Sequence, residues 1–261
     1  MRLNYKLKKE NYDFWAKRFK KKDSLVCTND PQLDQLEIDQ ILNKINNNKS
    51  ILEVGCGNGF ILKRLLKEKK IKSYLGIDFV EDFIASAKKK YKSNKVNFKI
   101  FDISLINNTT FKKKYDFIIS KRTIQNILSQ KLQMQIIDTL GYYLKKNGLM
   151  ILVESSNTAQ KNINKYRKLF SLPIIRPPFH NLFFNDLIVR SHKFKNIKLL
   201  NIDNFASGFY FLSRIIYASY AKILKEKLKY QHPLNQLGLN INSKVFKEDF
   251  SQVKTYLFKK K

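Results

Sequence analysis

The stretch that decides the fold runs from Ile51 to Phe60 and reads Ile-Leu-Glu-Val-Gly-Cys-Gly-Asn-Gly-Phe. An apolar strand is followed by three glycines at alternate positions, which open a helix. Glycine has no Cβ and reaches positive φ at little cost, so the backbone of this turn can come close to a ligand. Asp78 ends the next apolar run, Tyr74 to Ile77. Together the glycine turn and this carboxylate indicate a nucleoside pocket, with Asp78 placed for the ribose hydroxyls.

The spacing of the glycines bears on which nucleoside is bound. A dinucleotide fingerprint reads G-x-G-x-x-G, whereas this turn reads G-x-G-x-G and has Phe60 at the place of the third glycine. A helix N-terminus also suits pyrophosphate. However, Glu53 adds a negative charge two residues before the loop, which favours a ligand that carries a cation over one that carries phosphates. A dinucleotide remains the alternative.

The segment from Glu53 to Gly59, E-x-G-x-G-x-G, resembles motif I of class I S-adenosylmethionine (SAM)-dependent methyltransferases. The ligand of that family has an ammonium and a sulfonium but no phosphate. The resemblance covers residues 33–156 firmly and the remainder loosely. It implies SAM as the cofactor, and it implies a set of cofactor-binding residues along the first four strands. That set comprises Glu53, Gly55, Cys56, Gly57, Gly59, Asp78, Phe79, Asp102, Ile103 and Ser120.

Strands and helices alternate along the chain, which predicts an α/β fold with a parallel sheet and helices on both faces. The resemblance extends this to a Rossmann-like, mostly parallel sheet of seven strands with N-terminal helices. We expect strands near residues 50–54, 74–78, 96–101, 115–120, 149–154, 196–204 and 252–258. Helix starts are predicted at Asp30, which precedes Pro31, and at Ser129, because both are favourable N-caps.

We expect one domain over residues 1–261. The segments 1–48 and 49–156 would be the N-terminal helices and the cofactor-binding core. A helical lid would follow over 157–192, inserted after strand five, and the final strands and helix would occupy 193–261. In this fold the lid crosses above the cofactor, so the lid and the N-terminal helix should together cover the acceptor.

The formal net charge of +30 predicts attraction to anionic partners that weakens with salt. Only eight of the 51 basic residues are arginine, and the lysines are spread along the chain. A nucleic-acid reader usually concentrates its charge on one face. A small anionic acceptor is therefore favoured, and nucleic acid is the alternative partner.

The rest of the composition predicts a cytoplasmic protein. The N-terminus lacks the apolar core of a signal peptide, and the most apolar stretch is interrupted by charges, so we expect no membrane span. Cys27 and Cys56 are the only cysteines, and their spacing indicates neither a disulfide framework nor a metal site.

If SAM is bound, its methyl carbon is already electrophilic, and the protein must chiefly align the acceptor and exclude water. A general base helps when the acceptor is a hydroxyl. His180 lies among aromatic residues of the expected lid and is the candidate catalytic base, although a packing role is the alternative. Arg176, Asn181 and Arg122 are the candidate substrate-binding residues.

Two absences narrow the acceptor. Enzymes that methylate exocyclic base amines carry an Asn/Asp-Pro-Pro-aromatic turn after strand four, where this chain has Ser-Lys-Arg-Thr at 120–123. Neither cysteine lies in a loop suited to carbon-5 methylation of cytosine. Residues 119–126, His180-Asn181 and 204–214 also resemble a bacterial methyltransferase subgroup linked to surface-polysaccharide and modified-sugar pathways.

The sequence thus predicts O-methylation of a small anionic acceptor, such as a sugar, a nucleotide sugar or a phosphorylated precursor of surface polysaccharide. RNA methylation and a non-catalytic SAM-fold scaffold are the alternatives.

Overall fold

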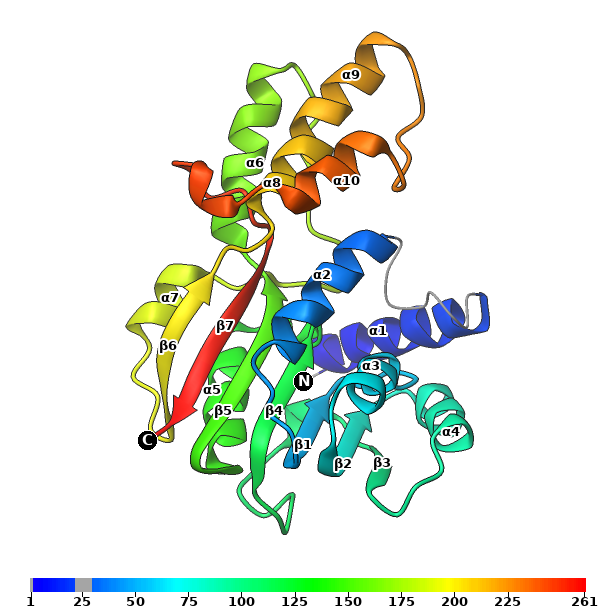
Figure 1. The fold of residues 1–261 in the computed structure, drawn as a ribbon, viewed down its shortest axis with the longest axis vertical. Helices are drawn as coiled ribbons and strands as arrows, with labels where there is room; N and C mark the ends of the chain where they lie inside the picture. The colour runs from blue at the N-terminus through cyan, green and yellow to red at the C-terminus, as the bar shows by residue number, and fades with distance from the viewer. Residues whose placement is uncertain (1, 22–29) are drawn as a thin grey trace.

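The computed structural model of the protein describes residues 2–21 and 30–261, built around one seven-stranded sheet (Figure 1). The strand order is β3-β2-β1-β4-β5-β7-β6, and only β7 runs against its neighbours. The sequence prediction of a mostly parallel, Rossmann-like sheet is confirmed. The strands are β1 (Lys49–Val54), β2 (Ile71–Asp78), β3 (Val96–Ile100), β4 (Tyr115–Lys121), β5 (Leu144–Ser155), β6 (Ile197–Asp203) and β7 (Val253–Lys260).

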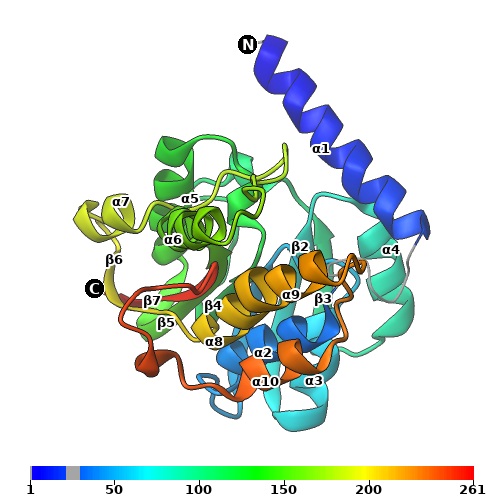
Figure 2. The same cartoon turned by 90° about the horizontal axis from the view of Figure 1, so that it is seen from above.

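Helices cover both faces of this sheet because successive residues of each strand point to opposite sides. On β1, Leu52 joins the cluster formed with α5, whereas Ile51 joins the cluster formed with α2 and α3. Figure 2 shows α5 and α7 on one side of the sheet and α2 and α3 on the other. The helices that flank the strands are α2 (Pro31–Leu42), α3 (Phe60–Glu68), α4 (Glu81–Lys90), α5 (Gln130–Tyr142) and α7 (Asp186–Ser191).

The predicted helix starts are confirmed at both N-caps. The Asp30 side chain accepts a hydrogen bond from the Leu33 N–H, and the Ser129 side chain accepts one from the Leu132 N–H. Each cap satisfies a backbone donor that the first helical turn leaves unpaired. These local contacts fix where α2 and α5 begin.

A cap of helices stands above the carboxyl ends of the strands (Figure 1). It is assembled from two separate stretches of chain, because α6 follows β5 whereas the other cap helices lie between β6 and β7. These helices are α6 (Asn157–Leu169), α8 (Ser207–Phe211), the π-helical turn η3 (Leu212–Ile216), α9 (Tyr217–Ile223) and α10 (Pro233–Asn240). The expected lid is therefore only part of the observed cap.

Three features of the secondary structure differ from the sequence prediction. Strand β5 begins at Leu144 rather than near residue 149, because its first part pairs with Tyr115 across a register shift. The helical stretch expected after residue 208 is broken by the π-turn. Helix α10 was not predicted, because a short polar segment gives little hydrophobic periodicity. Its N-cap is His232, which is half-buried and stacks on Tyr217 rather than lying free on the surface.

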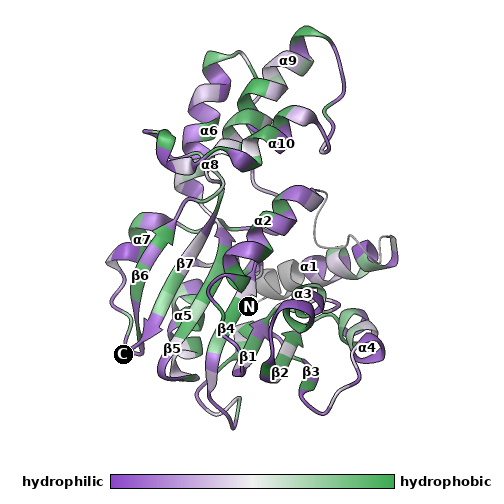
Figure 3. Cartoon of the chain, viewed as in Figure 1, coloured by the Kyte–Doolittle hydropathy of each residue, from purple (hydrophilic) through white to green (hydrophobic). Residues whose placement is uncertain are grey.

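Helix α1 (Arg2–Lys21) packs beside α4, and Figure 2 shows it running along the outer edge of the molecule rather than over the central strands. Cys27 lies outside the residues that the structure describes. Figure 3 shows that the central strands are the most continuously hydrophobic elements. Among residues 2–21 and 30–261, no helix combines the length and apolarity that crossing a bilayer requires.

Candidate active site

The glycine loop between β1 and α3 has the backbone geometry that its sequence predicts. Gly55, Gly57 and Gly59 have φ values of 72°, 51° and 83°. These values lie in the left-handed region, where a side chain adds strain. A Cβ on Gly55 would also stand 1.9 Å from the Thr123 hydroxyl oxygen. The loop is therefore restricted to glycine both by its conformation and by the neighbouring loop after β4.

Asp78 lies at the end of β2, directly beside this loop. Its carboxylate accepts hydrogen bonds from the Gly57 N–H and the Val80 N–H, both at 3.0 Å. Burial raises the pKa of Asp78 to about 6, although the hydrogen bonds from the backbone act in the opposite direction. The carboxylate is thus held in one orientation and is ionised at neutral pH, as an acceptor for ribose hydroxyls should be.

Asp78 lies between two cavities that adjoin along the strand ends. The larger is the first cavity, described below, and the smaller is the second cavity. The second cavity has a volume of about 100 Å³. Its walls are mainly apolar, and its polar groups come from Asn11, Asp78, Asp102, Thr123 and Asn126. The apolar lining consists of Val54, Ile77, Phe79, Phe101, Ile103 and Ile127. A flat apolar slot with a carboxylate at its edge suits an adenine ring and its amino group.

Four of the expected cofactor residues lie beneath the loop rather than along the cavities. Glu53 accepts a hydrogen bond from the Tyr74 hydroxyl at 2.6 Å, and burial raises its pKa to about 8. The Ser120 hydroxyl lies 3.2 Å from a carboxylate oxygen of Glu154, to which it donates. Cys56 is buried near Gly76, and Gly59 is the N-cap of α3. Direct contact of these four residues with SAM remains a prediction.

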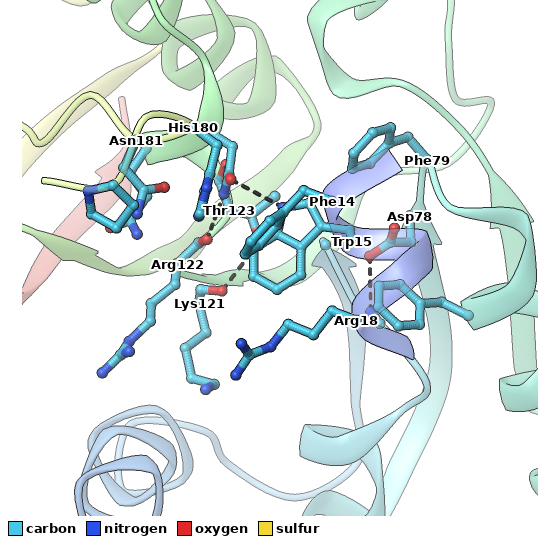
Figure 4. A pocket seen from close by; sticks show the side chains of 16 residues that line it. Phe14, Trp15, Arg18, Asp78, Phe79, Lys121, Arg122, Thr123, His180 and Asn181 are labelled. Carbon is cyan, nitrogen blue, oxygen red and sulfur yellow. Dashed lines mark hydrogen bonds between the residues drawn. The ribbon is translucent and has the colours of Figure 1, made fainter. Parts of the chain in front are cut away.

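The larger cavity, called here the first cavity, has a volume of about 270 Å³ (Figure 4). One side carries Gly55, Gly57, Asp78 and Phe79. The opposite side is built from the loop after β4, from the lid and from α1. The loop supplies Lys121, Arg122, Thr123, Gln125 and Asn126, the lid supplies His180 and Asn181, and α1 supplies Phe14, Trp15 and Arg18. The structure thus brings the cofactor loop together with His180, Asn181 and Arg122, whereas Arg176 is exposed on the lid and lines neither cavity.

His180 is held among aromatic rings at the edge of the first cavity. Its ring centroid lies 4.2 Å from that of Phe14, 5.6 Å from Trp15 and 5.0 Å from Phe179. Burial, with a smaller contribution from the charge of Arg18, lowers the pKa of His180 to about 4. The imidazole is therefore neutral at pH 7, and its buried Nδ1 has no hydrogen-bond partner in the described structure. Such a group can accept a hydrogen bond but is a weak base.

Arg122 is bound to α2 by an ion pair that sequence reasoning did not predict. Its Nε donates to Glu37 at 3.0 Å, and its neighbour Lys121 pairs with Asp34. Although burial acts against the charged form, Glu37 raises the pKa of Arg122. Asp34 and Glu37 are spaced at i and i+3, which places them on one face of α2. This spacing is the sequence signal that could have indicated an acidic helix face able to pair with Lys121 and Arg122.

Helix α1 closes the two cavities from outside the sheet. The Trp15 indole N–H donates to the Asn126 side-chain oxygen at 3.2 Å, and Tyr12 packs edge-on against Phe79. The Asn11 side chain also reaches the Asn126 carbonyl, at 3.4 Å. The sequence predicted an amphipathic helix here, but it did not identify Asn11, Trp15 or Asn126 as residues that close the site.

These features fit SAM better than a dinucleotide. The second cavity suits adenine, Asp78 suits the ribose, and Arg18 and Lys121 place positive charge in the first cavity, where the carboxylate of a methionine moiety would lie. Phe60 occupies the position at which a dinucleotide fingerprint has its third glycine. Among the described residues, no group of three or more His, Cys, Asp or Glu side chains could hold a metal ion.

Comparison with known proteins gives the same family. The model of the family described as "Methyltransferase domain" matches residues 45–204. The 235L protein of Invertebrate iridescent virus 6, which carries a provisional methyltransferase name, is 29% identical over 76% of this chain and 61% of its own length. The malonyl-acyl-carrier-protein O-methyltransferase of Acetivibrio thermocellus is 29% identical over 48% of this chain and 39% of its own length. The chain thus spans less than two thirds of either relative.

A similar fold is found in the TehB-like SAM-dependent methyltransferase of Corynebacterium glutamicum. The TM-score is 0.54 at 15% identity, over 97% of this chain and 99% of that one. The family match, the shared fold and the fit of the two cavities agree with one another. The chain therefore belongs to the methyltransferase-domain family, and it has the fold of a SAM-dependent methyltransferase.

Proposed function

We propose that this protein transfers the methyl group of SAM to an oxygen atom of a small anionic acceptor. The observation that carries the proposal is the first cavity. It has Gly57 and Asp78 on one side and Arg122, His180 and Asn181 on the other. Cofactor and acceptor could therefore meet in one enclosed space. The name of the Acetivibrio relative, an O-methyltransferase, supports oxygen as the acceptor atom.

SAM, when bound, supplies an electrophilic methyl carbon whose sulfur is the leaving group. The chain's own residues then have to hold the acceptor oxygen in line with that carbon and keep water out. Correct orientation can lower the barrier by roughly 7–11 kcal/mol. The aromatic side chains of Phe14 and Trp15 exclude water on the side covered by α1. His180 is neutral at pH 7 and accepts the hydrogen bond of an acceptor hydroxyl.

The acceptor class follows from the charges around the first cavity. Arg18, Lys121 and Arg122 line it, of which Lys121 and Arg122 are also paired with acidic residues of α2, and Asp78 is its only acidic lining residue within the described chain. This balance supports an anionic acceptor such as a sugar phosphate, a nucleotide sugar or a phosphorylated precursor of surface polysaccharide. The specific pathway is part of the proposal and rests on the sequence resemblance.

The test measures release of S-adenosylhomocysteine from SAM in the presence of a panel of sugar phosphates, nucleotide sugars and structured RNA. We expect turnover with at least one anionic small molecule and none with RNA. Methyl transfer to RNA alone would establish the competing function that the +30 charge suggests. Calorimetry that finds no binding of SAM would favour the non-catalytic scaffold.

The His180→Gln variant examines the chemical role of the imidazole in the same assay. Glutamine retains polar atoms but cannot take up a proton. With a hydroxyl acceptor, we expect turnover to fall by roughly 10²-fold, the low end of what a general base supplies because this imidazole is a weak base, while SAM affinity stays near that of the wild type. Unchanged turnover would assign His180 to packing.

A further inference from the structure

A third cavity, of about 190 Å³, adjoins the first cavity on the side of the helical cap. The two cavities share Arg122, Gln125, Pro178 and Asn181 as lining residues. The remaining walls come from the start of α2, from the cap and from the end of β5. A molecule whose reactive oxygen lies in the first cavity could therefore extend directly into the third.

Arg214 supplies a positive charge to this third cavity. It lies on the π-turn η3, and such turns are rare and are found often at functional sites. The guanidinium carbon lies 5.9 Å from the ring centroid of Phe209 and 5.7 Å from that of Tyr210. In the described part of the chain, Arg214 forms no ion pair and its guanidinium donates no hydrogen bond. The aromatic rings thus hold the group in place and leave its donors available.

No neighbour of Arg214 in the described structure forms an ion pair with it. The carbonyl of Arg214 accepts a hydrogen bond from Arg167, and burial and then the charge of Arg214 lower the pKa of that second guanidinium. Arg122, the other cation of the cavity, is already paired with Glu37. Asp30 is the one acidic residue that lines the third cavity in the described structure. Burial raises its pKa, whereas the hydrogen bond from the Leu33 N–H, by which it caps α2, and the charge of Arg214 act in the opposite direction.

Gln125 lies at the junction of the first and third cavities and is 4% exposed. Its Oε1 accepts a hydrogen bond from the Ser155 N–H at 2.8 Å, and its backbone N–H donates to Glu154. The amide group is therefore fixed in orientation. Its Nε2 has no hydrogen-bond partner among the described residues. This donor is therefore available to an acceptor atom of a ligand at the junction.

Asn181 shows the complementary feature on the lid. Its Oδ1 is buried and has no hydrogen-bond partner in the described structure, and the residue lines both cavities. The junction thus presents an unused donor on Gln125 and an unused acceptor on Asn181, with the guanidinium of Arg214 in the cavity beyond. This order of groups matches a molecule that has a hydroxyl and an oxyanion.

We propose that the third cavity is the acceptor subsite and that it binds an oxyanion, a phosphate or a carboxylate, through Arg214. Gln125 donates a hydrogen bond to the part of the acceptor that bridges the two cavities. The proposal rests on methyl transfer in the first cavity, as proposed above. In this proposal Arg214 recognises the anion, in place of the exposed Arg176 that the sequence suggested.

The experiment is calorimetric titration of the full chain, saturated with S-adenosylhomocysteine, with inorganic phosphate, glucose 1-phosphate and malonate. The first two probes test for a phosphate site and malonate tests for a carboxylate site. We expect binding of at least one probe. Arg214→Met keeps the apolar contacts with the two rings but removes the charge, so it should weaken that binding at least about tenfold.

Two further variants make the test specific. Lys227→Met removes one positive charge from the exposed loop after α9 and should leave binding unchanged. Gln125→Glu keeps an oxygen for the Ser155 N–H but replaces the free donor by an acceptor, so it should weaken binding of the probe by about tenfold. Circular dichroism and the melting temperature establish that each variant is folded, and Gln125→Glu carries the test if Arg214→Met does not fold.

The outcomes separate the two proposals. If S-adenosylhomocysteine binds but none of the three probes does, the oxyanion subsite is wrong while methyl transfer in the first cavity stands. Equal affinity of the wild type and Arg214→Met for the probe also overturns the subsite. If S-adenosylhomocysteine itself does not bind, the proposed function fails.

Discussion

Gly57 is the residue at which conformation and cofactor binding are most closely linked. Its φ is 51°, its N–H donates to Asp78, and it lines the first cavity. Gly57→Val would place a β-branched side chain in the left-handed region, which costs about 1–3 kcal/mol, and would add bulk beside the cofactor. We expect binding of S-adenosylhomocysteine to weaken by more than about a hundredfold, as measured by calorimetry.

Gly57→Ala is the control for this change, because it brings most of the backbone strain but little bulk. It should lower the melting temperature similarly and retain more of the cofactor affinity. Wild-type affinity in Gly57→Val would show that the loop does not contact the cofactor.

Asp78 gives cofactor binding a pH dependence of known sign. Its pKa in the free protein is raised to about 6 by burial, so the carboxylate is protonated below that pH. The ionised form is the stronger acceptor for ribose hydroxyls. We therefore expect affinity for S-adenosylhomocysteine to rise as the pH increases from 5 to 7 and to level off above 7. Titrations at several pH values in one buffer series test this.

Asp78→Asn removes the titrating group and leaves a neutral side chain of the same shape. Its affinity should be lower by roughly 1–3 kcal/mol at pH 7.5, the value of a hydrogen bond to a charged group, and should not follow the pH profile of the wild type. A variant with the same pH profile would place the titration on another residue.

At the scale of elements, α1 covers the two cavities, and its hydrophobic contacts are separate from the main core. Its aromatic side chains pack with Phe79 and Phe83 in a small cluster apart from the two large ones. Trp15→Ala removes the hydrogen bond to Asn126 and the contact with His180. We expect faster hydrogen exchange in α1 and a higher KM, with the unfolding free energy of the rest of the chain nearly unchanged.

Lys17→Ala, on the exposed face of the same helix, is the matched control and should leave exchange and KM unaltered. If Trp15→Ala destabilised the whole chain as strongly as a core substitution, α1 would have to be regarded as part of the core.

Helix α2 has a different role, because it neutralises the cations of the loop after β4. Glu37 is fully buried and pairs with Arg122 and, at 3.6 Å, with Lys121. Glu37→Gln would leave Arg122 without its ion-pair partner, whereas Lys121 would keep Asp34. Breaking a buried ion pair in this way costs roughly 3–5 kcal/mol, which urea unfolding can measure. The double variant Glu37→Gln, Arg122→Gln should recover part of that loss; no recovery would mean that the two residues are not coupled.

At the scale of the whole molecule, the charge of +30 acts over distances longer than any one contact. Screening shortens this range to about 10 Å at 0.1 M salt and to about 3 Å at 1 M. We expect KM for an anionic acceptor to rise several-fold between about 0.05 and 0.5 M sodium chloride, because long-range attraction is lost. The affinity for S-adenosylhomocysteine, a zwitterion, should change much less. A salt-independent KM would show that the lysines do not assist binding.

The sequence predicted the sheet and the cofactor loop because both are encoded locally. Continuous apolar runs define the central strands, the N-caps at Asp30 and Ser129 fix helix starts, and the three glycines require left-handed backbone. The position of Asp78 follows, since parallel strands end at one edge of the sheet. These features depend on residues that are neighbours along the chain.

The acceptor side depended on contacts between segments that are far apart in sequence. His180 was a candidate base by residue type, but the rings of α1 bury it and lower its pKa to about 4. Arg176 was a candidate for substrate binding and Arg214 was not, but the fold leaves Arg176 exposed and places Arg214 in a cavity beside Gln125.

Sequence alone therefore determined the family, the sheet and the glycine loop, because periodicity and turn chemistry are local properties. Tertiary structure alone decided which charges are neutralised, which polar atoms lack partners and which cavities adjoin. Burial and charge pairing are properties of positions in space, and residues as distant as Phe14, His180 and Arg214 acquire them only when the chain is folded.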